Sequence, residues 1–358
     1  MPLPSRTLMG PGPGNPYPEV ALGFARPLLG HLDPEFLTVL DETNDRLRQV
    51  WRTSNELTFP VSGTGSAGME ISFVNVVRPG SVVVVGVNGV FGGRMCEVAA
   101  RAGAEVVRVD FEWGQPVDPD RLVEAHPSPD VIALVHAETS TGVRSDVAAV
   151  GERKGDALLI ADCVTSLGGI PVEIDDWGVD IAYSGTQKCL GVPPGLAPFT
   201  INQRALDRVV PTPQSWYLDL NLIAGYIGSD SGRSYHHTAP ISMIQALHAG
   251  LGALLDEGLE ASWQRHERVG DLLKRGLVER GFELFAAEGY RLPELTTAVV
   301  PTSIDEAGVR RRLLTEYDIE VGGGLGPVAG KVWRIGTMGH TARTSNVEMF
   351  LAALDDLL

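Results

Sequence analysis

Short apolar runs alternate with segments of helical pattern between about residue 60 and residue 210. The runs are continuous and rich in Val, Ile and Ala, which is typical of strands that are covered on both faces of a sheet. Because amphipathic segments lie between these strands, the pattern predicts an α/β domain with a largely parallel sheet. The predicted strands are Val82–Val87, Glu105–Val109, Val131–His136, Leu158–Asp162, Asp180–Ser184 and Ala197–Ile201, and the helices between them include Gly93–Gly103 and Asp118–His126.

The pattern changes after Pro211. Two long helical patterns follow one another there, and beyond them strands and helices mix as in an α+β unit. We therefore expect an irregular N-terminal arm over residues 1–20, rich in Gly and Pro, a large domain over residues 21–257 and a small C-terminal domain over residues 258–358. The elements predicted in this part are helices over Ile241–Glu257, Leu259–Arg280, Asp305–Tyr317 and from Ser345, and strands over Thr296–Val300 and Lys331–Ile335.

Composition narrows the class of protein. The 358 residues suit one large domain with a smaller companion, and a hydrophobic content of 44% can build its core. A net charge of −16 repels phosphate backbones and anionic membranes, which argues against binding to nucleic acid or to membrane surfaces. Three scattered cysteines indicate reduced thiols, and neither a signal peptide nor a membrane span is visible. We expect a cytoplasmic protein with no metal site.

Lysine is rare, with four residues against 25 arginines, so each lysine invites a functional explanation. Lys188 follows a predicted buried strand and would stand at its carboxyl end, where open α/β sheets bind ligands. A lysine is poorly suited to burial unless its pKa shifts or it bonds covalently, and Schiff-base chemistry requires both. An ordinary surface lysine in a loop explains this stretch equally well.

A carboxylate, Asp162, ends another predicted strand. Its burial is costly unless it pairs with a cation or caps a helix, and the protonated ring nitrogen of pyridoxal phosphate is such a cation. Upstream, the loop Ser62–Gly68 precedes a helical run and could cradle a phosphate, although most loops of this kind are only turns. The loop lacks the lysine of a P-loop, and its glycine spacing does not follow a predicted strand, which argues against ATP or NAD.

Taken together, these residues resemble the class V pyridoxal-phosphate aminotransferases, in particular the alanine–glyoxylate and serine–glyoxylate group. The resemblance implies a fold-type I transferase, with a mostly parallel seven-stranded sheet in a large domain and a small α+β C-terminal domain. The blocks that carry it are Gly10–Pro13, Ser62–Gly68, Asn88–Gly92, His136–Gly142, Asp162–Gly169, Ser184–Lys188, Tyr235–Thr238, Gly322–Pro327 and Arg334–Gly336.

The resemblance also implies roles for residues around the cofactor ring. Lys188 would hold pyridoxal phosphate covalently and then move the substrate proton, while Asp162 would pair with the ring nitrogen. Phe91 would stack on the ring where relatives commonly have Trp, which keeps an aromatic face but loses area. Ser140 matches a hydroxyl near the ring.

Further residues are implied at the phosphate and at the substrate. Arg334 would clamp the substrate carboxylate, because a planar guanidinium binds it through two parallel hydrogen bonds. Ser66 stands where relatives often have His, and His236 and His237 would order a loop rather than bind a metal. The phosphate would be held by Thr64, Gly65, Ser66 and Gln187, joined by Tyr235 and Thr238 from the neighbouring subunit of a homodimer.

Several functions remain open from the sequence. The first is transfer of the amino group of alanine or serine to glyoxylate, which gives glycine. An alternative inside the family is (S)-ureidoglycine–glyoxylate aminotransferase, and a remote one is a binding module that keeps the fold without catalysis. A cysteine desulfurase is disfavoured, because that activity needs a cysteine in the C-terminal half and none follows Cys189.

Overall fold

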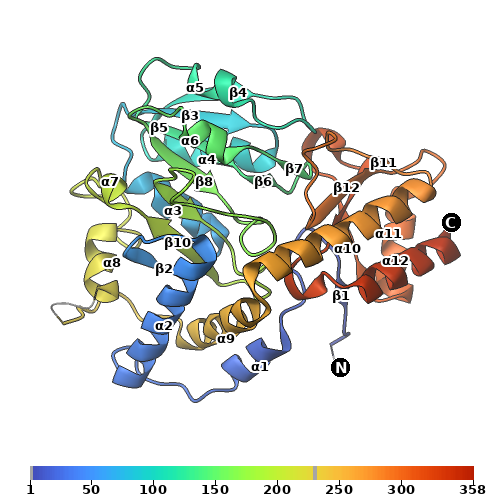
Figure 1. Ribbon diagram of the computed structural model, residues 1–358, viewed down its shortest axis with the longest axis horizontal. Coiled ribbons are helices and arrows are strands. Elements are labelled where there is room, and N and C mark those ends of the chain that lie inside the picture. The colour runs from blue at the N-terminus through green and yellow to red at the C-terminus, as the bar shows by residue number, and fades with distance from the viewer. Residues whose placement is uncertain (1–2, 229–231) are drawn as a thin grey trace.

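A seven-stranded sheet forms the centre of the larger part of the chain (Figure 1). The computed structural model describes residues 3–228 and 232–358. The strands lie in the order β2-β10-β9-β8-β5-β3-β4, with β10 antiparallel to both neighbours and the other pairs parallel, so the predicted mostly parallel sheet is confirmed. Their bounds are β2 Leu57–Ser62, β3 Val82–Val87, β4 Glu105–Asp110, β5 Val131–Val135, β8 Leu158–Asp162, β9 Ile181–Tyr183 and β10 Leu196–Ile201.

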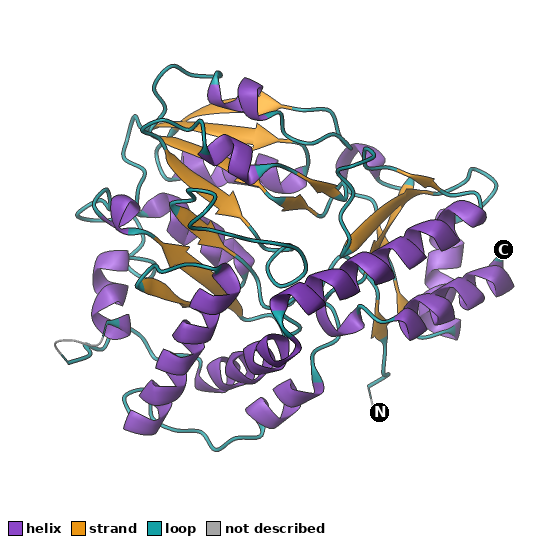
Figure 2. Cartoon of the chain, in the orientation of Figure 1, coloured by secondary structure: helices purple, strands orange, loops and turns teal. Residues whose placement is uncertain are grey.

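Both faces of this sheet are covered by helices, as the continuous apolar runs predict (Figure 2). Successive residues of β8 belong to different cores: Leu158 and Ile160 pack into one, and Leu159 and Ala161 into the other. The helices in this part are α1 Pro18–Phe24, α2 Pro34–Trp51, α3 Gly65–Val74, α4 Val90–Arg101, α5 Pro119–Val123, α6 Val147–Gly151, α7 Gln203–Leu206, α8 Leu220–Ile227 and α9 Ile241–Glu257.

The C-terminal part has its own sheet, in the order β11-β12-β15-β14, and its own core around Trp333 and Phe350. Gly258 separates α9 from α10, and the boundary predicted at Glu257 falls beside it. The elements are α10 Leu259–Glu279, β11 Glu283–Leu284, β12 Leu295–Val299, α11 Glu306–Glu316, β13 Ile319–Glu320, β14 Gly322–Gly323, β15 Val332–Gly336 and α12 Thr344–Leu357. A short hairpin of β6 Ala137–Glu138 and β7 Val143–Arg144 belongs to the larger part.

The N-terminal arm is more regular than predicted. Thr7 and Leu8 form β1, which pairs in parallel with β13, and α1 already begins at Pro18. The arm then crosses to the larger part, where the backbone N–H of Gly14 donates to the carbonyl of Gln187 at 3.0 Å. The first two residues of the predicted arm lie outside the described residues. The Gly- and Pro-rich composition indicated an irregular arm, but two residues are enough for an extended segment to pair with a strand that is distant in the sequence.

The prediction that no strand precedes the Ser62–Gly68 loop is wrong. Strand β2 runs directly into this loop, and α3 follows it. Pro60 interrupts the pattern that would predict this strand. Proline is tolerated mainly on edge strands, and β2 lies at one edge of the sheet. The spacing of these glycines after β2 therefore does not exclude a dinucleotide, and the residues that line the site decide which ligand binds.

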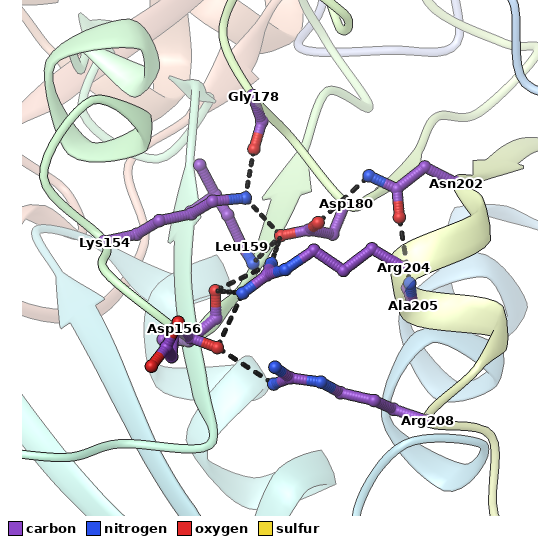
Figure 3. Close-up of polar contacts among 10 residues, drawn as sticks. Lys154, Asp156, Leu159, Gly178, Asp180, Asn202, Arg204, Ala205 and Arg208 are labelled. Atoms are coloured by element: carbon purple, nitrogen blue, oxygen red, sulfur yellow. Dashed lines mark hydrogen bonds and ion pairs between the residues drawn. The ribbon is translucent and has the colours of Figure 1, made fainter.

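A buried ion network braces the opposite end of the parallel strands from Lys188. Asp180, 1% exposed, precedes β9 and accepts hydrogen bonds from Leu159 N–H at 2.8 Å, Asn202 Nδ2 at 3.0 Å and Arg204 at 2.8 Å, as well as from the Lys154 ammonium (Figure 3). Burial alone would raise the pKa of Asp180, but these donors lower it below its ordinary value.

Within the described residues, no helix is both long and apolar enough to cross a membrane.

We expect Asp180→Asn to destabilise the fold, because two partly buried cations would then face an uncharged amide. Removing one partner of a buried ion pair costs about 3–5 kcal/mol. Urea unfolding followed by circular dichroism measures the loss. Asp120→Asn is the control: its ion pair with Arg153 is exposed, and its loss should cost at most about 1 kcal/mol. Equal losses in the two variants would contradict the role given to the buried network.

Candidate active site

A cavity of about 120 Å³ lies at the carboxyl ends of the parallel strands. Seven of the predicted site residues line it, contributed by the N-cap and first turn of α3, by α4, by the end of β8 and by the loop after β9. This is the edge at which open α/β sheets bind ligands. The seven are Thr64, Gly65, Ser66, Phe91, Asp162, Gln187 and Lys188.

The N-terminus of α3 forms one end of the cavity. Gly65 and Ser66 are its first two residues, so their backbone N–H groups have no acceptor within the helix and are suited to an anion. A Cβ at Gly65 would lie 2.9 Å from Val164 Cγ2, so the close packing requires glycine. The amide of Gln187 also lines the cavity, and its Nε2 can donate a hydrogen bond to an anion there. These groups fit a phosphate.

Asp162 supplies the negative charge of the cavity. Its Oδ1 accepts the N–H of Val164 at 2.9 Å and its Oδ2 accepts the hydroxyl of Tyr183 at 2.9 Å. Burial raises the pKa of Asp162 to about 6. Each carboxylate oxygen has a second lone pair, so the group can still accept from a cationic ring N–H. The sequence analysis missed Tyr183, although the parallel register places it opposite Asp162.

Lys188 lies between the cavity and the N-terminal arm. Its side chain is buried, and its ammonium donates to the carbonyl of Pro11. Burial lowers the pKa of Lys188 to about 8, and the nearby positive charge of Arg334 acts in the same direction. A substantial fraction of the amine is therefore neutral near pH 8, as a nucleophile or a base requires. The arm closes tightly here, since a Cβ at Gly12 would lie 2.5 Å from Lys188 Nζ.

Arg334 is buried on β15, with 8% of the residue exposed. Its Nε donates to the carbonyl of Gly323 at 2.8 Å, and a terminal nitrogen donates to the carbonyl of Thr139 at 3.4 Å. Thr139 lines the cavity, which links Arg334 to it. No carboxylate of the described residues forms an ion pair with Arg334, so its buried charge is suited to a ligand carboxylate.

Ser140 lies outside the lining of the cavity. Its hydroxyl donates to Glu138 at 2.7 Å and accepts the N–H of Val90 at 2.9 Å, so it is occupied by other parts of the chain. Phe91 does line the cavity, and the guanidinium of Arg94 lies 4.8 Å from its ring centre. The sequence analysis missed Arg94, whose position one helical turn after Phe91 was the available signal.

Tyr235 and Thr238 do not line the cavity of this chain. Both are exposed, and their hydroxyls lie 3.4 Å apart. Between them, His236 stacks on Trp216 with ring centres 4.6 Å apart, while His237 accepts or donates a hydrogen bond at Ser62 at 2.8 Å. The described residues hold no group of three or more His, Cys, Asp or Glu side chains that could bind a metal ion.

Comparison with known proteins places the chain in a family. The class-V aminotransferase family matches residues 25–349. A solved alanine–glyoxylate aminotransferase from Nostoc sp. superposes with a TM-score of 0.97 at 47% identity, covering 100% of this chain and 96% of that one.

Two curated relatives match over nearly the full length. An alanine–glyoxylate aminotransferase of Drosophila melanogaster is 38% identical over 99% of this chain and 93% of its own length. An (S)-ureidoglycine–glyoxylate transaminase of Bacillus subtilis is 37% identical over 99% of this chain and 91% of its own. Amino-group transfer on pyridoxal phosphate requires an amine, a carboxylate and groups that can bind an anion, and the cavity offers Lys188, Asp162 and the N-terminus of α3. The chain belongs to the class-V aminotransferases, and it is a transaminase that depends on pyridoxal phosphate.

Proposed function

We propose that the protein transfers the amino group of a small amino acid, alanine or serine, to glyoxylate and so forms glycine. The observation that carries the proposal is the buried Arg334, a guanidinium that forms no ion pair with a carboxylate of the described residues, close to the cavity that Lys188 lines. Glyoxylate appears in the names of the Nostoc, Drosophila and Bacillus relatives, whereas the amino donor differs among those names. The donor is thus the part that experiment must decide.

The cavity residues divide the work of transamination. Pyridoxal phosphate, when bound, supplies an electron sink for the charge that builds up at the substrate Cα as its proton leaves. Lys188 Nζ would take that proton and pass it to the cofactor carbon that bears the amino nitrogen, which its lowered pKa favours. Asp162 stabilises positive charge at the ring nitrogen. Arg334 binds the substrate carboxylate and thereby orients the Cα–H bond.

The remaining contacts hold the cofactor in place. The N–H groups of Gly65 and Ser66, together with the side chains of Thr64 and Gln187, bind its phosphate. Phe91 stacks on the face of its ring. Ser140 acts behind Phe91 rather than at the ring, because its hydroxyl is already bonded on both sides.

We further propose a homodimer in which Tyr235 and Thr238 reach the phosphate of the neighbouring subunit. Both residues are exposed and lie outside the lining of their own cavity. Trp216 beside them is 64% exposed, and exposed aromatic residues are typical of protein interfaces.

The three cysteines are free thiols, which supports a cytoplasmic location.

The donor can be read from the visible absorption of the purified holoenzyme. We expect L-alanine to remove the visible band of the bound cofactor and glyoxylate to restore it with release of glycine, whereas D-alanine should have no effect. L-Serine should act in the same way if the pocket accepts its hydroxyl. A band that is unchanged by alanine and serine but lost with (S)-ureidoglycine would establish the alternative donor and overturn the proposal.

Lys188→Ala should abolish both the visible band and transamination, because the chain would lose the amine that bonds the cofactor and moves the proton. Lys331→Ala is the matched control, since Lys331 is exposed and, among the described residues, its ammonium donates to the carbonyl of Pro327 alone. Absorbance and coupled amino-transfer assays measure both variants. Retained activity in Lys188→Ala would refute the role of this lysine.

Arg334→Lys keeps the positive charge but loses the two-pronged contact with a carboxylate. We expect KM for both the amino acid and glyoxylate to rise by roughly 10- to 100-fold, as the loss of a charged hydrogen bond worth about 1.5–3 kcal/mol implies. The affinity for pyridoxal phosphate should not change. Arg312→Lys, an exposed pair partner on α11, controls for the substitution itself. Unchanged KM values in Arg334→Lys would contradict a substrate contact.

A further inference from the structure

Glu138 is a fully buried carboxylate that the proposed reaction does not use. It ends β6, and one of its oxygens, Oε1, accepts both the N–H of Ser140 at 2.9 Å and its hydroxyl at 2.7 Å. The other oxygen, Oε2, accepts the N–H groups of Phe91 at 3.0 Å and Gly92 at 3.4 Å. Two of these four hydrogen bonds come from Ser140, and the other two come from the first turn of α4.

These contacts cap the first turn of α4 from outside the helix. Val90, Phe91 and Gly92 are its first three residues, so their N–H groups have no acceptor within the helix. Gly89 at the N-cap has no side chain to bind them, and a Cβ there would lie 2.4 Å from Glu138 Cδ. Ser140 takes the N–H of Val90 and Glu138 takes the other two, so the whole turn is held by this pair.

The capped turn carries a residue of the cofactor cavity. Phe91 lines the cavity, whereas Glu138 and Ser140 do not. A negative charge at a helix N-terminus is favourable, and a charged hydrogen bond is stronger than a neutral one. Glu138 therefore restrains the backbone from which the Phe91 ring projects, while Arg94 packs on that ring from the next turn.

We propose that Glu138 is a positioning residue: with Ser140 it clamps the first turn of α4 and thereby holds the Phe91 ring against the cofactor. The proposal rests on the stacking role given to Phe91 under the proposed function and is independent of the amino donor. It also explains why a serine of the His136–Gly142 block is buried behind the cavity wall. Both carboxylate oxygens face backbone and hydroxyl donors, so Glu138 does not act on the substrate.

A double-mutant cycle tests this coupling through the affinity of the apoenzyme for pyridoxal phosphate, measured by visible absorbance titration. Glu138→Gln keeps the shape but cannot accept all four hydrogen bonds, and we expect binding about tenfold weaker. In the Phe91→Leu background the same change should weaken binding by less than about twofold, because the ring that Glu138 positions is absent. Asp146→Asn, the corresponding acid-to-amide substitution at the exposed cap of α6, should have no effect.

The remaining outcomes of the double-mutant cycle would contradict the positioning role of Glu138. Equal losses from Glu138→Gln in both backgrounds would show that Glu138 does not act through Phe91 and would overturn the proposal. If Phe91→Leu alone leaves the affinity unchanged, the stacking role fails first, and the positioning role fails with it. Thermal unfolding shows whether each variant folds. If Glu138→Gln does not fold, Ser140→Ala replaces it, and its effect on the affinity for pyridoxal phosphate is again compared with and without Phe91. A loss from Ser140→Ala that persists without Phe91 would mean a direct contact with the cofactor and would refute the clamp.

Discussion

The parallel pairing of β8 with β9 is the constraint on which the site depends. Its register sets Asp162 opposite Tyr183, so a carboxylate and the phenol that steadies it leave the sheet at the same edge. Lys188 follows a few residues later and turns back toward the same cavity. A shift of the register by one residue would send these side chains to opposite faces of the sheet. The apolar strands that fill both cores thus also set the catalytic geometry.

The two ends of the parallel strands show two uses of buried charge. At one end, Asp180 is surrounded by donors, and its low pKa reports a network that is satisfied within the chain. At the other end, burial raises the pKa of Asp162 to about 6 and lowers that of Lys188 to about 8. The shift at Asp162 reflects a buried charge that a cationic ring nitrogen would offset, and the shift at Lys188 makes its neutral amine available as a base. Stability and chemistry are separated along the same strands.

The sequence was informative where function follows directly from a buried strand. The mostly parallel sheet is confirmed, and Asp162 and Lys188 line one cavity because each follows a strand of that sheet. The edge strand β2 was missed because Pro60 interrupts its pattern, and β1 because two residues carry no pattern at all. Arg334 could be proposed only by resemblance, since its strand belongs to the other sheet.

Tyr183, Arg94 and Glu138 were missed for a different reason. Tyr183 and Glu138 act through neighbours that are distant in sequence, about which hydrophobic periodicity contains no information, whereas the spacing of Arg94 from Phe91 on one helix face was an available signal. Ser140 illustrates the same limit, because the sequence reveals a hydroxyl in a recognisable block but not the direction in which it bonds. Pairing register and helix capping are properties of the assembled chain.

The N-terminal arm has a consequence for the order in which the molecule is completed. Arg6 and Asp318, which form an ion pair, are separated by 312 positions along the chain, and β1 can pair only after β13 exists. During synthesis the arm therefore emerges long before β13 and docks only after that strand has formed. Pro11, the partner of Lys188, belongs to this arm. The burial that lowers the pKa of Lys188, to which the closely packed Gly12 of the arm contributes, is thus completed only when the arm docks.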